Sequence, residues 1–371
     1  MAANRHASRR KKLLRAIRKE GANAILVTNE KNVRWLTGFT GDSTWMLLTR
    51  TDAILLSDTR YTTQIKNECG EQDLSVEIRD AGGTMLKTVE KALKKLKLSN
   101  LAFESDAVTH ASYTGIADAA GTTELVPTSA ITENLRAVKD KQEIADIRLA
   151  VEIAQRGMAT LRAGLKPEMT ELQVAHDLEH AMRSFGATRA GFDPIIAVGP
   201  NAALPHAVPG SAKIGDHGVL LVDWGAETPD GYRSDLTRVL ITGTIPPKVE
   251  AVYGVVLKAQ LAAIKAIKPG AKCKDIDNIA RTIIDKAGYT KYFGHGLGHG
   301  FGLQIHEQPR ASPISEQVLE AGMVITVEPG IYLPGRFGVR IEDDILVTRD
   351  GYEVLSSLPK QFEDCFVEYL T

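Results

Sequence analysis

The order of apolar and polar positions gives the first third of the chain a clear pattern. Short apolar runs alternate there with amphipathic segments. The runs predict strands at 24–28, 44–49, 52–57 and 100–105, and the amphipathic segments predict helices at 5–19 and 84–98. Strands and helices that alternate in this way are typical of an α/β domain, here with a mixed sheet.

A polar stretch after Pro127 interrupts this pattern and indicates a domain boundary. The interpretation that follows is two domains, at 1–132 and 133–371. The second domain opens with the periodicity of one long amphipathic helix, at 133–154.

The second domain continues with helices and strands of the same kinds. Thr170 has the side chain of an N-cap, which indicates a helix at 170–183. Two more helices are predicted at 247–267 and 273–287. The final apolar runs predict three strands, at 323–330, 336–348 and 351–356.

Composition excludes some classes of function. The chain has 371 residues, of which 43% are hydrophobic, enough for two sizeable cores. A net charge of −1 provides no general attraction to nucleic acid or to an anionic membrane. The three cysteines are odd in number and lack a CxxC spacing, which fits a reducing compartment. With no apolar run near the roughly 20 residues of a membrane span, we expect a cytoplasmic protein.

The N-terminal segment 5–19 is rich in arginine and lysine. It lacks the apolar core of a secretory signal. A narrow apolar stripe at helical spacing indicates a helix whose basic face is solvated. An arm that binds nucleic acid and a transit peptide are the weaker alternatives.

A glycine-rich stretch, Tyr292–Glu307, reads YFGHGLGHGFGLQIHE and has glycine at every second position from 294 to 302. This excludes a helix, because each interior glycine costs about 1 kcal/mol relative to alanine. It favours an extended segment whose bare face admits another backbone or a ligand. His295 and His299 share the other face, and His306 follows. Because the helical HExxH zinc motif is absent, a metal here needs further ligands from elsewhere.

Four carboxylates stand at the ends of apolar runs or inside them: Asp223, Asp235, Glu328 and Glu342. A buried carboxylate is costly unless it is paired or binds a metal. Together with His299 these side chains would form a site for two divalent metal ions. An oxygen-rich ligand set favours Mn²⁺, with Co²⁺ or Zn²⁺ as alternatives.

Two neighbours of these carboxylates lie on the same strand faces by the two-residue period of a strand. Thr237 shares a face with Asp235, and Arg340 shares one with Glu342, whereas Asp343 points the other way. We therefore predict that Thr237 and Arg340 hold the ligand carboxylates in place by hydrogen bonds.

The order Asp223, Asp235, His299, Glu328, Glu342 resembles the ligand order of the pita-bread metallopeptidases, which are methionine aminopeptidase, aminopeptidase P and prolidase. The segment NEKNVRWLTGFTGDSTWMLLT, followed by LLSDTRY, is similar to the N-terminal domain of aminopeptidase P, prolidase and creatinase. Simple methionine aminopeptidases lack that domain. The resemblance covers most of the chain. It implies a small creatinase-like α/β domain followed by a pita-bread catalytic domain, an α/β (α+β) fold.

The resemblance also implies how the ligands divide between two ions. Asp223 would bind one ion, His299 and Glu328 the other, and Asp235 and Glu342 would bridge both. Two such ions bring the pKa of a shared water toward neutrality. Asp223 and Asp235 are twelve positions apart where the family pattern predicts eleven, and the extra residue fits in the loop between them, where an insertion costs little.

Three side chains are implied in catalysis by the same resemblance. His206, in the segment PNAALPHA, would contact the scissile peptide or its leaving nitrogen. His306 would bond near the carbonyl oxygen, and Glu328 would shuttle the proton. The loop acids Glu227 and Asp230 are predicted to be solvated.

The implied activity is cleavage of the Xaa-Pro bond, at the N-terminus of peptides as in aminopeptidase P or in dipeptides as in prolidase. The carboxylate of a dipeptide needs a cation, for which Arg189, Arg336 or an arginine of another subunit are the candidates. The resemblance implies a homodimer and permits Trp35, Arg34 and Tyr61 to contact a neighbouring subunit's site. Ordinary packing or surface positions are the favoured interpretation of these three residues.

Two alternative functions come from other classes. One is a metal-free, creatinase-like hydrolase, and the other is an inactive module of the same fold that binds peptides or proteins. Either should lack several of the metal ligands, whereas this chain has all five. A buried acidic cluster without a metal would be costly to keep.

Overall fold

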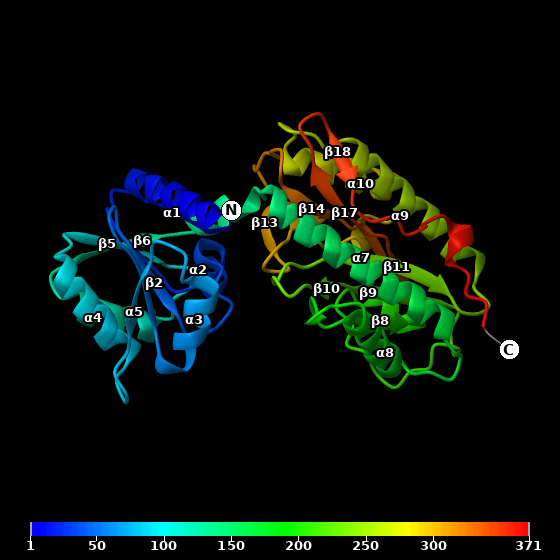
Figure 1. Ribbon diagram of the computed structural model, residues 1–371. Helices are drawn as coiled ribbons and strands as arrows, with labels where there is room; N and C mark the ends of the chain where they lie inside the picture. Colours follow the sequence, from blue (N-terminus) through cyan, green and yellow to red (C-terminus); the bar gives the residue numbers. More distant parts are fainter. Residues whose placement is uncertain (1, 370–371) are drawn as a thin grey trace. The chain divides into compact units, whose positions relative to one another are not determined.

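The computed structural model describes residues 2–369, which form two compact units (Figure 1). One unit ends at Arg136 and the other begins at Ala137, within the short helix α6 (Ile131–Ala137). The boundary expected from the sequence lies in the same helix. Both units combine helices with strands, which confirms the predicted fold class. No helix among the described residues has both the length and the apolar character to cross a bilayer.

The first unit is built on a six-stranded sheet in the order β4-β3-β2-β1-β5-β6. The strand β1 is antiparallel to β2 and parallel to β5, so the sheet is mixed as predicted. Its strands are β1 (Ile25–Val27), β2 (Trp45–Leu48), β3 (Ala53–Ser57), β4 (Ser75–Ile78), β5 (Asn100–Glu104) and β6 (Glu124–Thr128). Its other helices are α1 (Ala2–Lys19), α2 (Glu30–Thr37), α3 (Thr62–Cys69), α4 (Met85–Leu96) and α5 (His110–Ala120).

The basic helix α1 is less solvated than its sequence predicts. Arg9 and Arg10 are each only 5% exposed. Their guanidinium groups donate hydrogen bonds to the carbonyl oxygens of Trp35 and Leu36, in the last turn of α2, where helix carbonyl oxygens generally need partners from outside the helix. The prediction of a wholly solvated basic face is therefore wrong for these two arginines. Trp35, 3% exposed and stacked under Arg9, packs within its own unit and is not available for contact with another subunit.

The buried His6 predicts a pH dependence for the stability of this unit. Its Nδ1 lies 3.0 Å from the carbonyl oxygen of Trp35, and burial lowers the pKa of His6 to about 4. Between pH 6.5 and pH 4 the side chain of His6 is protonated in the unfolded chain but stays neutral in the folded chain. The free energy of unfolding should therefore fall as the pH drops through this window, by at most about 3 kcal/mol.

Urea unfolding between pH 7 and pH 4 measures this slope. In the variant His6→Gln the free energy of unfolding should depend less steeply on pH than in the unchanged protein. Glutamine does not titrate, so the difference in proton binding between the folded and unfolded chains is removed. His110→Gln replaces an exposed histidine of the same unit and should leave the slope as it is. Equal slopes in His6→Gln and the unchanged protein would show that His6 has no part in it.

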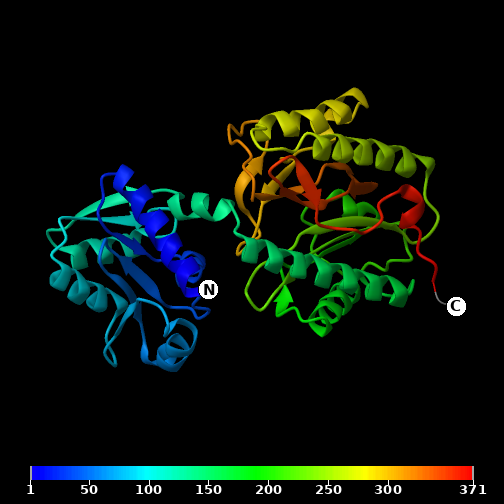
Figure 2. The same ribbon diagram turned by 45° about the horizontal axis from the view of Figure 1, so that its top comes forward.

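The second unit places strands between two pairs of helices (Figure 2). Helices α7 (Lys141–Gly164) and α8 (Glu171–Ser184) pack against a three-stranded sheet, β11-β9-β8. Helices α9 (Pro247–Lys265) and α10 (Cys273–Lys286) pack on the opposite side, against strands of the C-terminal third of the chain. The strands between α8 and α9 along the chain are β7 (Arg189–Ala190), β8 (Ile195–Val198), β9 (Val219–Trp224), β10 (Ala226–Glu227) and β11 (Leu236–Ile241).

The predicted long helix at 133–154 is two helices in the structure. α6 ends at Ala137 and α7 begins at Lys141. Asp140 interrupts the helical path, because its side chain accepts hydrogen bonds from the backbone N–H groups of Gln142 and Glu143. The Glu143 carboxylate accepts in return from the N–H of Asp140, which completes a capping box. Thr170 is the N-cap of α8, as its sequence predicted, and it also forms a second such box with Gln173.

The C-terminal third has more strands than the three predicted. They are β12 (Gly298–Gly300), β13 (Glu307–Ala311), β14 (Val324–Val327), β15 (Gly330–Leu333), β16 (Phe337–Arg340), β17 (Asp343–Val347) and β18 (Tyr352–Val354). The run 336–348 is not one strand, because β16 pairs with β15 while β17 pairs with β14 in a different sheet. Glu342 lies in the short connection between β16 and β17, where the chain passes from one sheet to the other.

The glycine-rich stretch approaches other backbone segments closely, as predicted. A Cβ atom on Gly298 would lie 2.0 Å from the carbonyl oxygen of Thr326, and one on Gly300 would lie 2.1 Å from that of Gln308. Only β12 within the stretch is a regular strand, and a Cβ on Gly294 would meet nothing within 4 Å. A Cβ on Gly296 would lie 2.8 Å from the carbonyl oxygen of Ala311. The requirement for a bare face therefore extends from Gly296 to Gly300 and is tightest at the two glycines that flank His299.

Candidate metal centre and active site

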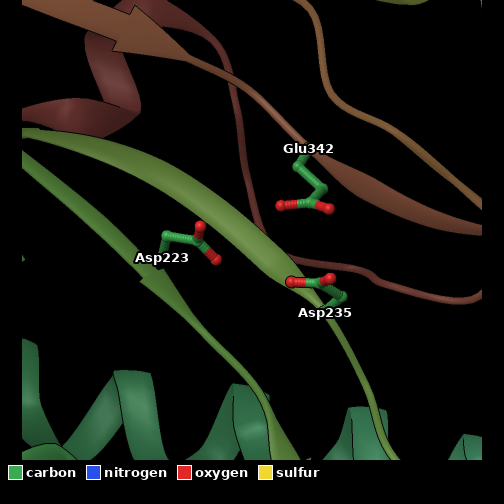
Figure 3. Close-up of side chains that lie close together, drawn as sticks. All are labelled: Asp223, Asp235 and Glu342. Atoms are coloured by element: carbon green, nitrogen blue, oxygen red, sulfur yellow. The ribbon is translucent and has the colours of Figure 1, made fainter. Parts of the chain in front are cut away.

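The hairpin of β9 and β11 carries the first two candidate ligands. The strands are antiparallel, with Thr237 opposite Asp223, and Asp235 comes immediately before β11. Glu342 reaches the same place from the crossing between β16 and β17. The carboxylates of Asp223, Asp235 and Glu342 point toward one another (Figure 3), and one oxygen of each lies within 4.8 Å of the others.

The other two candidate ligands complete the cluster. His299 Nε2 lies 3.6 Å from Asp235 Oδ2 and 3.3 Å from Glu328 Oε1. His299 is oriented by its Nδ1, which lies 3.1 Å from the carbonyl oxygen of Gly300. The Glu328 carboxylate accepts a hydrogen bond from Thr326 Oγ1, at 3.1 Å. The structure thus brings all five side chains of the predicted ligand set together.

The electrostatics of the cluster favour a bound cation. Burial raises the pKa of Asp223, Asp235 and Glu342, and repulsion by the neighbouring carboxylates raises those of Asp235 and Glu342 further. Burial likewise raises the pKa of Glu328 to about 7 and lowers that of His299 to about 3. Four acids this close resist ionisation together unless positive charge is placed among them.

The buried oxygens of the cluster support the same conclusion. Asp223 Oδ1 and Glu342 Oε1 are inaccessible to solvent and accept no hydrogen bond among the described residues. Leaving a buried acceptor unsatisfied costs about 1–3 kcal/mol. Carboxylate oxygens with one imidazole are a donor set that divalent ions such as Mn²⁺ bind. The residues present therefore fit a divalent metal centre.

Arg340 and Thr237 contact the cluster in the way the strand faces predicted. Arg340 donates to Asp223 Oδ2 at 2.5 Å and to Thr237 Oγ1 at 3.0 Å. Thr237 in turn donates to Glu342 Oε2 at 2.7 Å. Arg340 is 3% exposed, so this contact is a buried ion pair that offsets part of the negative charge.

Sequence reasoning missed Tyr332 and gave His295 no role. Tyr332 Oη accepts a hydrogen bond from Arg340 at 2.9 Å and lies 2.9 Å from His295 Nε2. The chain of contacts from Asp223 thus extends through Arg340 and Tyr332 to the glycine-rich stretch. Only the parity of His295 with His299 hinted at this, because Tyr332 has the sequence appearance of an ordinary strand residue.

Two further acids, Asp343 and Asp344, were also given no role in the site. Asp344 Oδ2 accepts from the backbone N–H of Asp235 at 3.1 Å, which fixes the start of β11 beside the cluster. Asp343 points away, as predicted, and forms an ion pair with Arg238 at 2.8 Å and another with Lys360. Asp344 therefore helps to position a candidate metal ligand, whereas Asp343 belongs to a separate buried group of ion pairs.

A cavity of 540 Å³ opens onto the cluster. Its lining includes Asp223, Asp235, His299, Glu328 and Arg340 together with His206, His306 and Arg310. The His306 ring stands edge-on to that of His299, with 4.5 Å between the ring centroids. His206 and His306 are both exposed, so a ligand in the cavity can reach them.

The predicted cations for a substrate carboxylate lie elsewhere. Arg189 and Arg336 do not line this cavity, whereas Arg310, which sequence reasoning missed, does. Arg189 instead pairs with Glu227 at 3.1 Å. The prediction of a solvated Glu227 is wrong, because this residue is 6% exposed, belongs to β10 and also pairs with Arg233 at 2.7 Å.

Comparison with known proteins identifies the class. Residues 145–349 match the model of metallopeptidase family M24, and residues 9–138 match that of the creatinase/prolidase N-terminal domain. The chain belongs to metallopeptidase family M24, in the aminopeptidase P and prolidase branch of the pita-bread fold. Membership supports a peptidase, and the family implies divalent metal ions, for which the acidic cluster is the candidate site.

Individual relatives agree over nearly the whole chain. The Bacillus subtilis protein named uncharacterized peptidase YqhT is 37% identical over 92% of this chain and 95% of its own length. A structure described as Xaa-Pro dipeptidase from Bacillus anthracis is 38% identical, with a TM-score of 0.91 over 96% of this chain and 99% of that one. One described as X-Pro aminopeptidase from Thermotoga maritima MSB8 is 36% identical, with a TM-score of 0.84 over 94% and 99%.

Proposed function

We propose that the protein hydrolyses the Xaa-Pro bond of short peptides with two divalent metal ions, and that these are Mn²⁺, the ion that the oxygen-rich ligand set favours. The observation that carries the proposal is the convergence of Asp223, Asp235, His299, Glu328 and Glu342 beside one cavity. All of these except Glu342 line it, together with His206 and His306. The names of the two similar solved structures, an Xaa-Pro dipeptidase and an X-Pro aminopeptidase, support the substrate class.

The ligand roles are those that the family resemblance implies. Asp235 and Glu342, which lie near both Asp223 and the His299–Glu328 pair, would serve both ions. Asp223 would hold one ion, and His299 with Glu328 would hold the other. When bound, the two ions supply Lewis acidity and an activated water.

The chain's own residues position the peptide and move its protons. His306 stands beside His299 and donates a hydrogen bond toward the scissile carbonyl oxygen. His206, on the cavity wall, contacts the leaving nitrogen. Glu328 accepts a proton from the water whose oxygen bonds to the scissile carbonyl carbon, and passes this proton to the leaving nitrogen. The carbon–nitrogen bond then breaks and releases the new amine and the new carboxylate. Arg340 orients Asp223 and, as a neighbouring positive charge, favours its ionised form against the effect of burial.

Removal of metal provides the direct test. Protein stripped with a chelator should hydrolyse neither Ala-Pro nor Ala-Pro-Ala, and added Mn²⁺ should restore hydrolysis, because the residues alone cannot activate water. The ratio of the two rates of hydrolysis assigns the peptide length, with preference for Ala-Pro indicating a prolidase. Binding of metal without cleavage of either peptide would contradict the Xaa-Pro proposal while leaving the metal centre intact, and methionyl peptides would be tested next.

The same measurements address the alternatives. Hydrolysis that persists in verified metal-free protein would favour the creatinase-like mechanism. Failure to bind any metal, together with no hydrolysis, would favour a module that only binds peptides or proteins. A homodimer is part of the proposal, on the resemblance alone, and sedimentation of the metal-loaded protein measures it.

A further inference from the structure

The loop that carries His306 is short and closed at its base. It runs from Phe301 to His306, between β12 and β13, and is closed by the pairing of Gly300 with Glu307, next to an irregularity in the ladder. Among the described residues, no hydrogen bond to the His306 ring is present beside its contact with His299. The position of the ring therefore depends on what holds the loop.

Glu307 holds the loop from its C-terminal end. Its Oε1 accepts a hydrogen bond from the backbone N–H of Gln304 at 2.9 Å, in the middle of the loop. Its Oε2 lies 3.2 Å from the ammonium group of Lys139. The side chains of Lys139 and Glu307 are only 1% and 4% exposed, so this ion pair is shielded from water. Removal of one partner from a buried ion pair of this kind strongly destabilises the folded protein.

Gly302 provides the space for this pair. A Cβ atom at Gly302 would lie 3.2 Å from Lys139 Cε and 3.2 Å from Glu307 Oε2. The carbonyl oxygen of Gly302 accepts a hydrogen bond from the backbone N–H of Arg233, in the loop between the two aspartate ligands. The loop is thus attached on one side to Lys139 and on the other to the hairpin that carries Asp223 and Asp235.

Lys139 is itself held firmly, although it lies between α6 and α7. Its backbone N–H donates to the carbonyl oxygen of Gly322 at 2.9 Å, and Val138 bridges to Met323 just before β14. The ammonium group is therefore presented from a fixed piece of backbone. A flexible surface lysine could not restrain a loop in this way.

We propose that Lys139 and Glu307 are positioning residues for His306. The ion pair fixes the six-residue loop so that the His306 ring stays edge-on to His299, facing the cavity in which the scissile carbonyl would lie. This inference rests on the proposed function for the role of His306, but not for the geometry of the loop. Misplacement of a catalytic group by about 1 Å can lower the rate about 100-fold.

The test is a double-mutant cycle between Lys139→Met and His306→Ala, measured on the Mn²⁺-loaded protein with the better of the two proline peptides. Lys139→Met should lower kcat about 10- to 100-fold and change KM by less than about 3-fold. In the His306→Ala background, the same change should lower kcat by less than about 3-fold, because the group it positions is already absent. Bound metal per chain should stay the same in all four proteins.

Control variants separate positioning from general damage. Lys141→Met removes an exposed lysine next to the same linker and should leave kcat unchanged. If Lys139→Met does not fold, the uncharged pair Lys139→Met with Glu307→Gln avoids a lone buried charge and takes its place in the cycle. Equal losses of kcat with and without His306 would overturn the proposal, as would no loss at all.

A crystal structure of the Lys139 variant gives a readout that does not require activity. The proposal predicts that residues 301–306 shift or lose order while the five candidate ligands stay in place. An unchanged loop would contradict it. If the unchanged protein cleaves no proline peptide, the proposed function fails, and the loop measurement still decides the role of the ion pair in holding His306.

Discussion

Asp235→Ala should abolish metal binding and lower kcat/KM for the proline peptide by about 10³-fold or more. Asp235 faces Asp223 and Glu342 within 4.8 Å and His299 at 3.6 Å, so in the proposed centre it is one of the two carboxylates that both ions would share. Metal content per chain and peptide hydrolysis measure the two effects. Full activity in a verified metal-free variant would refute the two-metal scheme.

The same variant should not destabilise the metal-free protein. Burial and repulsion from Glu342 raise the pKa of Asp235, so its charge opposes folding when no cation is present. The thermal midpoint without metal should therefore stay the same or rise, while the increase on adding Mn²⁺ should disappear. Asp230→Ala, an exposed acid of the same hairpin loop, is the matched control and should keep metal binding, activity and the Mn²⁺-dependent increase.

Arg340→Met should destabilise the metal-free protein by about 3–5 kcal/mol, which is typical for loss of one partner from a buried ion pair. Arg340 donates hydrogen bonds to Asp223, Thr237 and Tyr332 from a site that is 3% exposed. Its removal leaves the carboxylate cluster without its buried positive neighbour. Chemical unfolding with and without Mn²⁺ measures the loss, which should be smaller with the metal bound because the ions supply positive charge.

Activity should fall as well, by about 10- to 100-fold, because outer partners of metal ligands orient them. Arg340→Lys should recover only part of either property, since one ammonium group cannot replace a forked guanidinium. Arg336→Met changes an exposed arginine just before β16 and serves as the control. Unchanged stability of metal-free Arg340→Met would show that Arg340 does not balance the cluster.

The candidate carboxylate ligands could be predicted from the sequence because each acid stands at an end of a local apolar run or inside one. Asp223 and Glu328 end apolar runs, and Glu342 interrupts one, which is costly for a buried carboxylate unless it has a purpose. Thr237 and Arg340 were predictable from strand alternation for the same reason. Such patterns are local, and they survive errors in the number of strands, such as the division of 336–348 into β16 and β17.

Other features could not be predicted because they depend on long-range contacts. Lys139 is one cation in a polar stretch, and only the fold shows that it meets Glu307 in a dry interior. Tyr332 is similar, since its importance comes from reaching both Arg340 and His295. The break between α6 and α7 was predictable in principle, because Asp140 followed by Glu143 is a capping box.

The candidate ligands enter the site from segments that are far apart in the chain, from Asp223 on β9 to Glu342 after β16. A nascent chain from which only the first of these segments has emerged contains only part of the proposed metal site. The ions of the proposed centre can be captured only when the last strands have emerged and docked. Metal acquisition would then be a late event in the biogenesis of the protein, and would mark a finished catalytic unit.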